Sequence, residues 1–172
     1  MLRRPDALLN PQFFAEDGAV WFPDAYNLGL HSLFVPQAGY LHSLTRLIAL
    51  LTLLFPFTTA PLVMNLCAIT VQILPVNVLL SGRFSAIPLS TRALAAFLYL
   101  GLPNSYEIDA NITTIQWHLA LVACLLLFAE PAESLGWRIL DVVTLALISV
   151  DGPLGILLVP VAAVLWRNRL GG

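Results

Sequence analysis

One long apolar stretch without a single charged residue, residues 59–82, constrains the fold of this chain more than any other feature. A helix needs about 20 predominantly apolar residues to cross the hydrocarbon core of a bilayer, and this stretch provides them. Hydrophobic residues make up 59% of the chain and charged residues only 10%, whereas soluble domains average about 25% charged residues. We therefore expect an integral membrane protein.

Four further apolar runs follow, and each falls short of that spanning length. They cover residues 89–102, 114–128, 139–150 and 153–166. Short helices can cross by local thinning of the bilayer, or they can enter and leave on the same side. The pattern predicts an all-α, polytopic transmembrane bundle over residues 59–172, with about five passes, of which the last two alternatively form a re-entrant hairpin around residues 150–153.

The arginines predict the orientation of this bundle. Basic residues in short loops favour the cytoplasmic side, and the eight basic residues of this chain are all arginine. Arg83, Arg92 and Arg138 lie beside alternate loops, and Arg167 and Arg169 follow the last run. The remaining loops and residues 1–58 then face the outside. A net charge of -2 gives no reason to expect a nucleic-acid partner.

Residues 1–58 form a separate region, predicted to be an extracytoplasmic loop with short juxtamembrane helices. Within it, residues 39–57 show a broad apolar face at helical spacing and a narrower stripe that carries His42 and Arg46. This segment is either a helix lying at the membrane interface, which we favour, or a spanning helix. A spanning helix would reverse the side of the N-terminal carboxylates relative to the arginine loops.

Glu16 and Asp17 are the first candidates for chemistry. Two adjacent carboxylates in a partly dehydrated site can bind a divalent cation, or one can act as a base while the other stays ionised, because like charges separate their proton affinities. The alternative is that they cap the helix that begins near Gly18, where a carboxylate offsets the helix dipole.

A second polar segment, residues 104–118, is predicted on the same side of the membrane. Its candidates for substrate contact are Asp109, Asn111, Gln116 and His118. Polar side chains at that depth are costly unless they face a cavity or partners. The alternative is an ordinary loop in which Thr113 or Thr114 caps the next helix. Asp151 either forms a turn, which we favour, or adds a third wall to the site.

His42 and Arg46 are candidates for contact with a phosphate. They lie one helical turn apart, and a guanidinium matches the geometry of a phosphate. The alternative is that Arg46 extends to lipid headgroups while its aliphatic part stays in the apolar layer.

The order of these parts resembles the N-terminal half of the GT-C glycosyltransferases, polytopic enzymes that take sugars from polyprenyl-phosphate carriers. The segment Phe13-Phe14-Ala15-Glu16-Asp17-Gly18 is similar to their acidic motif, and residues 39–57 resemble their juxtamembrane helix. Residues 103–118 resemble their second loop, and residues 148–153 the turn between their fifth and sixth helices. Residues 10–18 and 102–107 look specifically like bacterial glucosyltransferase-like membrane proteins.

The resemblance implies transfer of a sugar from a polyprenyl-phosphate donor to a lipid-linked or cell-surface glycan, at the outer face of a bacterial inner membrane. Asp17 or Glu16 would be the base. His42 and Arg46 would contact phosphate, and the four candidates in residues 104–118 the sugar or acceptor. Some members also hold a divalent cation at the acidic motif. Members usually have further helices before and after these parts, so we expect a fragment of a longer enzyme.

Two rival interpretations remain open at the level of sequence. One is a non-enzymatic membrane protein, such as a carrier, a flippase component or an assembly subunit, whose acidic segment binds a cation or partner. The other is a decayed fragment without a function of its own. Placement separates the first from an enzyme, because a carrier gathers its polar residues near the bilayer midplane.

Overall fold

The computed structural model describes residues 4–103, 106–151 and 153–170, and these residues fold entirely into helices and loops. The N-terminal region contains α1 (Asp6–Leu9), η1 (Asp17–Trp21), α2 (Phe22–Leu28), η2 (Gly29–Phe34) and α3 (Ser43–Thr52). The remainder contains η3 (Phe57–Thr59), α4 (Ala60–Leu80), η4 (Gly82–Phe84), α5 (Leu89–Gly101), α6 (Ile115–Phe128), α7 (Leu135–Val150) and α8 (Pro153–Leu170). The all-α class is therefore confirmed.

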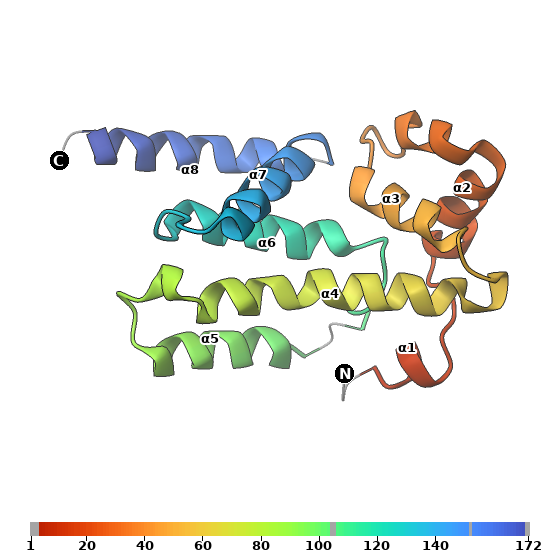
Figure 1. The fold of residues 1–172 in the computed structure, drawn as a ribbon, viewed down its shortest axis with the longest axis horizontal. Coiled ribbons are helices and arrows are strands. Elements are labelled where there is room, and N and C mark those ends of the chain that lie inside the picture. The colour runs from red at the N-terminus through yellow and green to blue at the C-terminus, as the bar shows by residue number, and fades with distance from the viewer. Residues whose placement is uncertain (1–3, 104–105, 152, 171–172) are drawn as a thin grey trace.

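Helix α4 is the axis of the molecule, and two groups of helices pack along it (Figure 1). Helices α1 and α3 contact its first half, and α5 and α6 flank it on opposite sides. Met64, Ala68 and Val71 of α4 join a first core with α2, α3 and the start of α6. Val78 joins a second core with residues of α6. One continuous helix thus carries both cores.

Most of the predicted helix positions agree with the structure, but the start of α7 and the end of α8, which extends to Leu170 instead of 166, do not. The stretch predicted at residues 59–82 is α4, entered through the turn η3, and α5 and α6 lie within one residue of their predicted ends. Helix α7 begins at Leu135, four residues before the apolar run at 139, because Ser134 caps it by accepting a hydrogen bond from the Trp137 amide.

Membrane-spanning length is met by one stretch only among the described residues. Phe57–Leu80 is long and apolar enough to cross a membrane, whereas the apolar helical stretches Ser43–Thr52, Leu89–Gly101, Ile115–Phe128 and Leu154–Leu165 are shorter. Length and composition therefore support one span directly and leave the predicted number of passes unconfirmed.

Helices α4 to α8 run alternately in opposite directions, which gives the bundle two distinct ends (Figure 1). At one end, here called the arginine end, lie the segments 81–88 and 129–134. Arg83 there binds both carboxylate oxygens of Asp141, at 2.6 and 2.9 Å, and the Glu130 carbonyl. Arg92 donates to the Ser81 carbonyl at the end of α4. At the other end, here called the polar end, lie residues 101–103, residues 106–114 and Asp151.

Helix α3 is packed with its polar stripe toward the protein. Thr45, Arg46 and Thr52 are buried, while Leu47, Leu51 and Leu54 are exposed. Its ten residues are half of the about 20 that a spanning helix needs, which does not fit the spanning alternative for residues 39–57. The outward leucines suit an apolar surrounding on that face.

The turn predicted at residues 150–153 includes Gly152, which lies outside the described residues, but the contacts of Asp151 are described. Its buried carboxylate accepts hydrogen bonds from the Ser43 amide at 2.5 Å and the Leu44 amide at 3.1 Å, so it caps the first turn of α3 from a distant part of the chain. The first amides of a helix lack partners within the helix, and a carboxylate placed there is stabilising. Asp151 thus ties the end of α7 to the N-terminal region.

Candidate functional site

A buried carboxylate, that of Asp17, joins the two polar segments of the sequence. It accepts hydrogen bonds from the Thr113 hydroxyl at 2.6 Å, the Thr113 amide at 3.0 Å and the Ile112 amide at 3.4 Å. The Thr113 hydroxyl oxygen in turn accepts a hydrogen bond from the Trp21 indole. Residues far apart in the sequence therefore meet at the polar end, as expected from their predicted positions.

The local backbone explains how Asp17 reaches this position. Ala15 has a positive φ of 42°, and Asp17 begins a π-helical turn, so the chain reverses sharply just before the carboxylate. At Gly18, an added Cβ would lie 2.8 Å from the Phe13 Cβ, which leaves room for glycine only. The sequence from Phe13 to Gly18 thus acts as one packed turn.

The structure separates Glu16 from Asp17. Asp17 is fully buried, whereas Glu16 is exposed. Adjacent residues on a helix point about 100° apart, so they do not share a face. The two carboxylates therefore have different surroundings in this conformation. Glu16 lies at the N-cap of η1 and Asp17 in its first turn, the positions that the capping alternative expects, but Glu16 makes no capping hydrogen bond and Asp17 binds another segment. The described residues contain no cluster of three or more His, Cys, Asp or Glu side chains suited to a metal ion.

Burial raises the pKa of Asp17 to about 6, well above the ordinary 3.8. Hydrogen bonds from Thr113 and Ile112 favour the ionised form and act against this shift, but loss of water is the larger effect. A carboxyl group with this pKa exchanges its proton near neutral pH.

His42 and Arg46 lie together, as expected, but they face Trp21 rather than solvent. The His42 ring is 5.0 Å from the Trp21 ring, and the Arg46 guanidinium lies 5.1 Å above it. Arg46 pairs with Asp24 at 3.0 Å and donates to the Leu41 carbonyl. With an exposed fraction of only 1%, Arg46 does not extend to headgroups. Burial also lowers the pKa of His42.

Gln116 and Asn111, two of the candidates for substrate contact, are engaged within the protein. The Gln116 side chain hydrogen-bonds to His42. Asn111 is fully buried, where its amide donates to the Glu107 carbonyl and its oxygen accepts from the amide and hydroxyl of Thr114. Asn111 therefore braces the loop, and in this conformation it offers no group to a ligand.

Asp109 and His118 belong to one hydrogen-bonded network that involves α4 and α5. Asp109 accepts a hydrogen bond from the Gln72 side chain at 2.6 Å. The Tyr99 hydroxyl donates to the Gln72 carbonyl and lies 2.7 Å from His118 Nδ1, and the other ring nitrogen lies 3.2 Å from the Ile108 carbonyl. Sequence reasoning missed Tyr99, because nothing distinguishes one tyrosine in an apolar run.

Comparisons with protein-family models, with curated proteins and with solved structures found no match for this chain. The resemblance to GT-C enzymes is therefore an expectation from short motifs, and function has to be inferred from the geometry of the polar end.

The raised pKa of Asp17 predicts how stability depends on pH. The folded chain holds this proton more tightly than the unfolded chain, so the free energy of unfolding should fall as the pH rises from about 4 to about 6, by up to roughly 3 kcal/mol from this group. Asp17→Asn keeps an oxygen that can accept from Thr113 but does not titrate. In thermal unfolding across this pH range, the melting temperature of the variant should rise relative to that of the wild type as the pH rises.

The lowered pKa of His42 makes the free energy of unfolding increase with pH. This contribution is present in both the wild type and Asp17→Asn, so it cancels when their stabilities are subtracted. Unfolding curves of the wild type and Asp17→Asn that run parallel with pH would contradict the assignment.

Proposed function

We propose that this chain forms a polytopic bundle in a bacterial inner membrane and transfers a sugar from a polyprenyl-phosphate donor to a lipid-linked or cell-surface glycan. The reaction takes place at the polar end of the bundle, which faces the outside. The observation that carries the proposal is the Asp17–Thr113 contact, because it brings the exposed Glu16 and the loop before α6 to one place.

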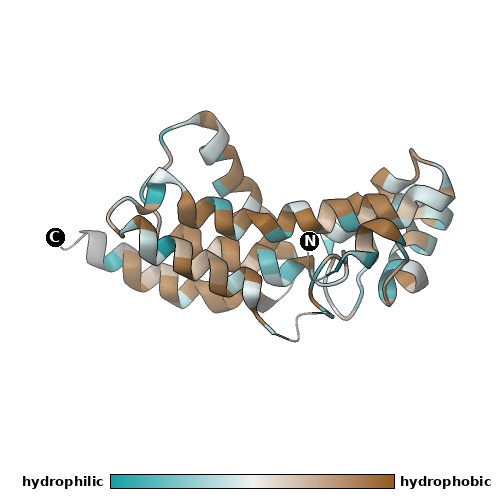
Figure 2. Ribbon diagram, turned by 90° about the horizontal axis from the view of Figure 1, so that it is seen from below, coloured by the Kyte–Doolittle hydropathy of each residue, from teal (hydrophilic) through white to brown (hydrophobic). Residues whose placement is uncertain are grey.

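Outward-facing apolar side chains support the membrane location. Large apolar residues are more than half exposed on α5, α7 and α8 among other helices, and Figure 2 shows hydrophobic residues along the length of the bundle. They include Leu94, Phe97 and Leu98 on α5, Ile139 and Val142 on α7, and Ile156, Leu157 and Val159 on α8. Soluble monomers rarely expose contiguous apolar surface on this scale, whereas a bilayer covers it.

The arginine end supports the proposed orientation. Arg83, Arg92 and Arg138 lie there, as basic residues do on the cytoplasmic side of short loops. Helices α5 and α6, with 13 and 14 residues, are about 20 Å long, so the bilayer would thin locally around them.

An apolar cavity of about 390 Å³ between α2 and the end of α3 supports a lipid-linked donor. Phe22, Phe55 and Phe57 are among its lining residues, together with Leu53 just after α3. A prenyl chain would lie here. The Arg46–Asp24 ion pair joins the same two helices but does not line the cavity, so a donor phosphate would reach the guanidinium only by displacing Asp24.

In this proposal Glu16 is the base and Asp17 is a positioning residue. A base must come within hydrogen-bond reach of the acceptor hydroxyl, and Glu16 is exposed whereas Asp17 is enclosed by its own partners. Glu16 takes the proton as the acceptor oxygen bonds to the sugar and the lipid phosphate leaves. Asp17 fixes the turn that presents Glu16.

One observation favours the rival interpretation of a non-enzymatic assembly subunit. Asn111 and His118, expected to contact substrate, are bound to partners within the protein. A carrier is less well supported, because the polar groups gather at one end of α5 to α8 rather than between their ends.

Membrane exposure can be measured with spin labels. Phe97→Cys and Val142→Cys, each in a Cys67→Ala, Cys124→Ala background, place a label on the outward faces of α5 and α7. In liposomes both labels should be relaxed more by oxygen than by a water-soluble nickel chelate, because oxygen concentrates in lipid. Glu133→Cys, an exposed position at the arginine end, is the control that should favour nickel. Preferential relaxation of the first two labels by nickel would contradict a membrane location.

Transfer can be tested with a radiolabelled polyprenyl-phosphate hexose and membranes that contain the chain. Glu16→Gln should lower transfer by about 100-fold or more, since general base catalysis contributes roughly 10²- to 10⁴-fold, while thermal stability stays unchanged. Glu133→Gln is the matched control and should retain activity. Undiminished transfer by Glu16→Gln would remove Glu16 as the base, and absence of transfer by the wild type would refute the enzymatic proposal.

A further inference from the structure

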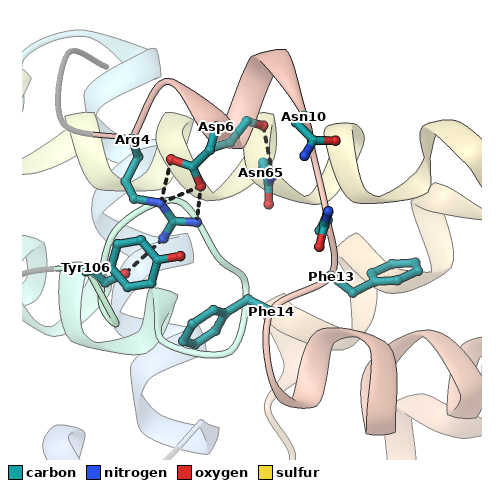
Figure 3. A pocket seen from close by; sticks show the side chains of 9 residues that line it. Arg4, Asp6, Asn10, Phe13, Phe14, Asn65 and Tyr106 are labelled. Carbon is teal, nitrogen blue, oxygen red and sulfur yellow. Dashed lines mark hydrogen bonds and ion pairs between the residues drawn. The ribbon is translucent and has the colours of Figure 1, made fainter.

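A cavity of about 270 Å³ lies between residues 4–14, α4 and Tyr106 (Figure 3). It borders the Phe13–Gly18 turn but lies apart from the Asp17–Thr113 contact, and its lining is mainly polar. Asp6, Asn10, Gln12 and Asn65 line it together with the rings of Phe14 and Tyr106. Ligand sites typically combine such a concave shape with a few convergent polar groups.

Arg4 builds this cavity rather than serving as its ligand-binding group. Its guanidinium lies 4.0 Å from the centre of the Tyr106 ring and donates to the Tyr106 and Asp109 carbonyls. The remaining nitrogens contact the Asp6 carboxylate at 3.0 Å. The donors of Arg4 are therefore occupied, and a phosphate or carboxylate would find no free guanidinium fork here.

The charge of the cavity points to a neutral ligand. Arg4 and Asp6 are the charged residues of the lining, and they neutralise each other. Arg4 also lowers the pKa of Asp6, which keeps this half-exposed carboxylate ionised and able to accept hydrogen bonds. An isolated cation would have to compete with Arg4 for it.

The polar groups of the lining both donate and accept hydrogen bonds. Asn10 and Gln12 are exposed primary amides, each with two N–H donors and one oxygen. Asn65 donates to the Ala7 carbonyl at 2.9 Å, and its amide oxygen points toward the space between α1 and the 10–14 segment (Figure 3). A ligand that suits this set carries several hydroxyl groups, because each hydroxyl also donates and accepts.

Two aromatic rings supply the apolar part of the wall. Phe14 and Tyr106 meet edge to face with ring centres 6.4 Å apart. The Tyr106 hydroxyl points toward the centre of the drawn residues (Figure 3), and no described residue hydrogen-bonds to it. Rings of this kind pack against the C–H face of a saturated ring while leaving its hydroxyls to polar neighbours. The volume lies just below the roughly 300 Å³ of the smallest drug-sized pockets, which suits a single six-membered ring.

We propose that this cavity binds a neutral polyhydroxylated ring, one monosaccharide unit, through the amides of Asn10, Gln12 and Asn65, the Asp6 carboxylate, and the ring and hydroxyl of Tyr106. The cavity lies beside the turn that holds Asp17, since Phe13 and Phe14 line it and the Asp17 amide donates to the Phe14 carbonyl. That the bound unit is the sugar or acceptor of the transfer rests on the proposed function, whereas binding itself does not.

Saturation-transfer NMR on the full chain in nanodiscs tests this site with methyl glucoside, methyl mannoside and methyl galactoside as probes. At least one glycoside should receive saturation. Gln12→Ala and Tyr106→Phe should each weaken its binding by roughly 3- to 10-fold, the loss expected for one hydrogen-bonding group. Asn27→Ala, which removes an exposed amide outside the cavity, is the matched control and should bind as the wild type does. Circular dichroism checks that each variant is folded.

Several results would overturn the proposal. The first is that none of the three glycosides receives saturation. The second is that Gln12→Ala and Tyr106→Phe leave glycoside binding unchanged. The third is that inorganic phosphate displaces the glycoside at equal concentration. Glu16→Gln should keep glycoside binding while it loses transfer. Transfer that depends on Glu16 without glycoside binding would therefore refute this site alone, and binding without any transfer would refute the proposed function alone.

Discussion

The hydrogen bonds between the Asp17 carboxylate and Thr113 are the interaction on which the rest of this structure depends. They connect the turn that precedes α2 with the loop that precedes α6, two segments that lie 96 residues apart in the sequence. Trp21 reinforces the connection through the same hydroxyl and also contacts His42 and Arg46. The N-terminal region is also held to the bundle by α4, by the Asp151 cap on α3, by the hydrogen bond from the Thr45 hydroxyl to the Ile112 carbonyl, and by the Arg4 contacts with the Tyr106 and Asp109 carbonyls.

The fully buried Asp17 carboxylate reduces the stability of the fold. Burial of a charge is unfavourable unless hydrogen bonds replace the lost water, and here the replacement is incomplete, which is why the Asp17 proton is held so tightly. A neutral side chain could fill the same space at a lower cost. Perturbed carboxyl groups gather at functional sites more often than elsewhere, and this one holds an exposed carboxylate, Glu16, in a defined place.

Hydropathy was sufficient to predict the helices and the meeting of the two polar segments, but it could not predict their contacts. The run at residues 59–82 predicts a long helix clearly, because it contains no charged residue and no alternation of polar and apolar residues typical of a strand. The orientation of α3 was not predictable, since its leucine face and its polar stripe are both regular and the surroundings decide which is buried. Glu16 and Asp17 are neighbours in the sequence, and nothing in it shows that the π-helical turn buries Asp17 and leaves Glu16 exposed. The cavity beside Arg4 depends on the contact between the Arg4 guanidinium and Tyr106. These two residues are about a hundred positions apart, and no repeating pattern in the sequence indicates that they meet.

Whether the two polar segments form one unit at the polar end can be measured with a double-mutant cycle. Asp17→Ala, Thr113→Val and the double variant are unfolded reversibly in mixed micelles, and the coupling free energy is taken from the four stabilities. We expect a coupling of about 1.5 to 3 kcal/mol, the range for a hydrogen bond to a charged group. Additive effects of the two substitutions, with a coupling near zero, would show that the Thr113 hydroxyl does not bind Asp17 and would contradict the contact that joins the segments.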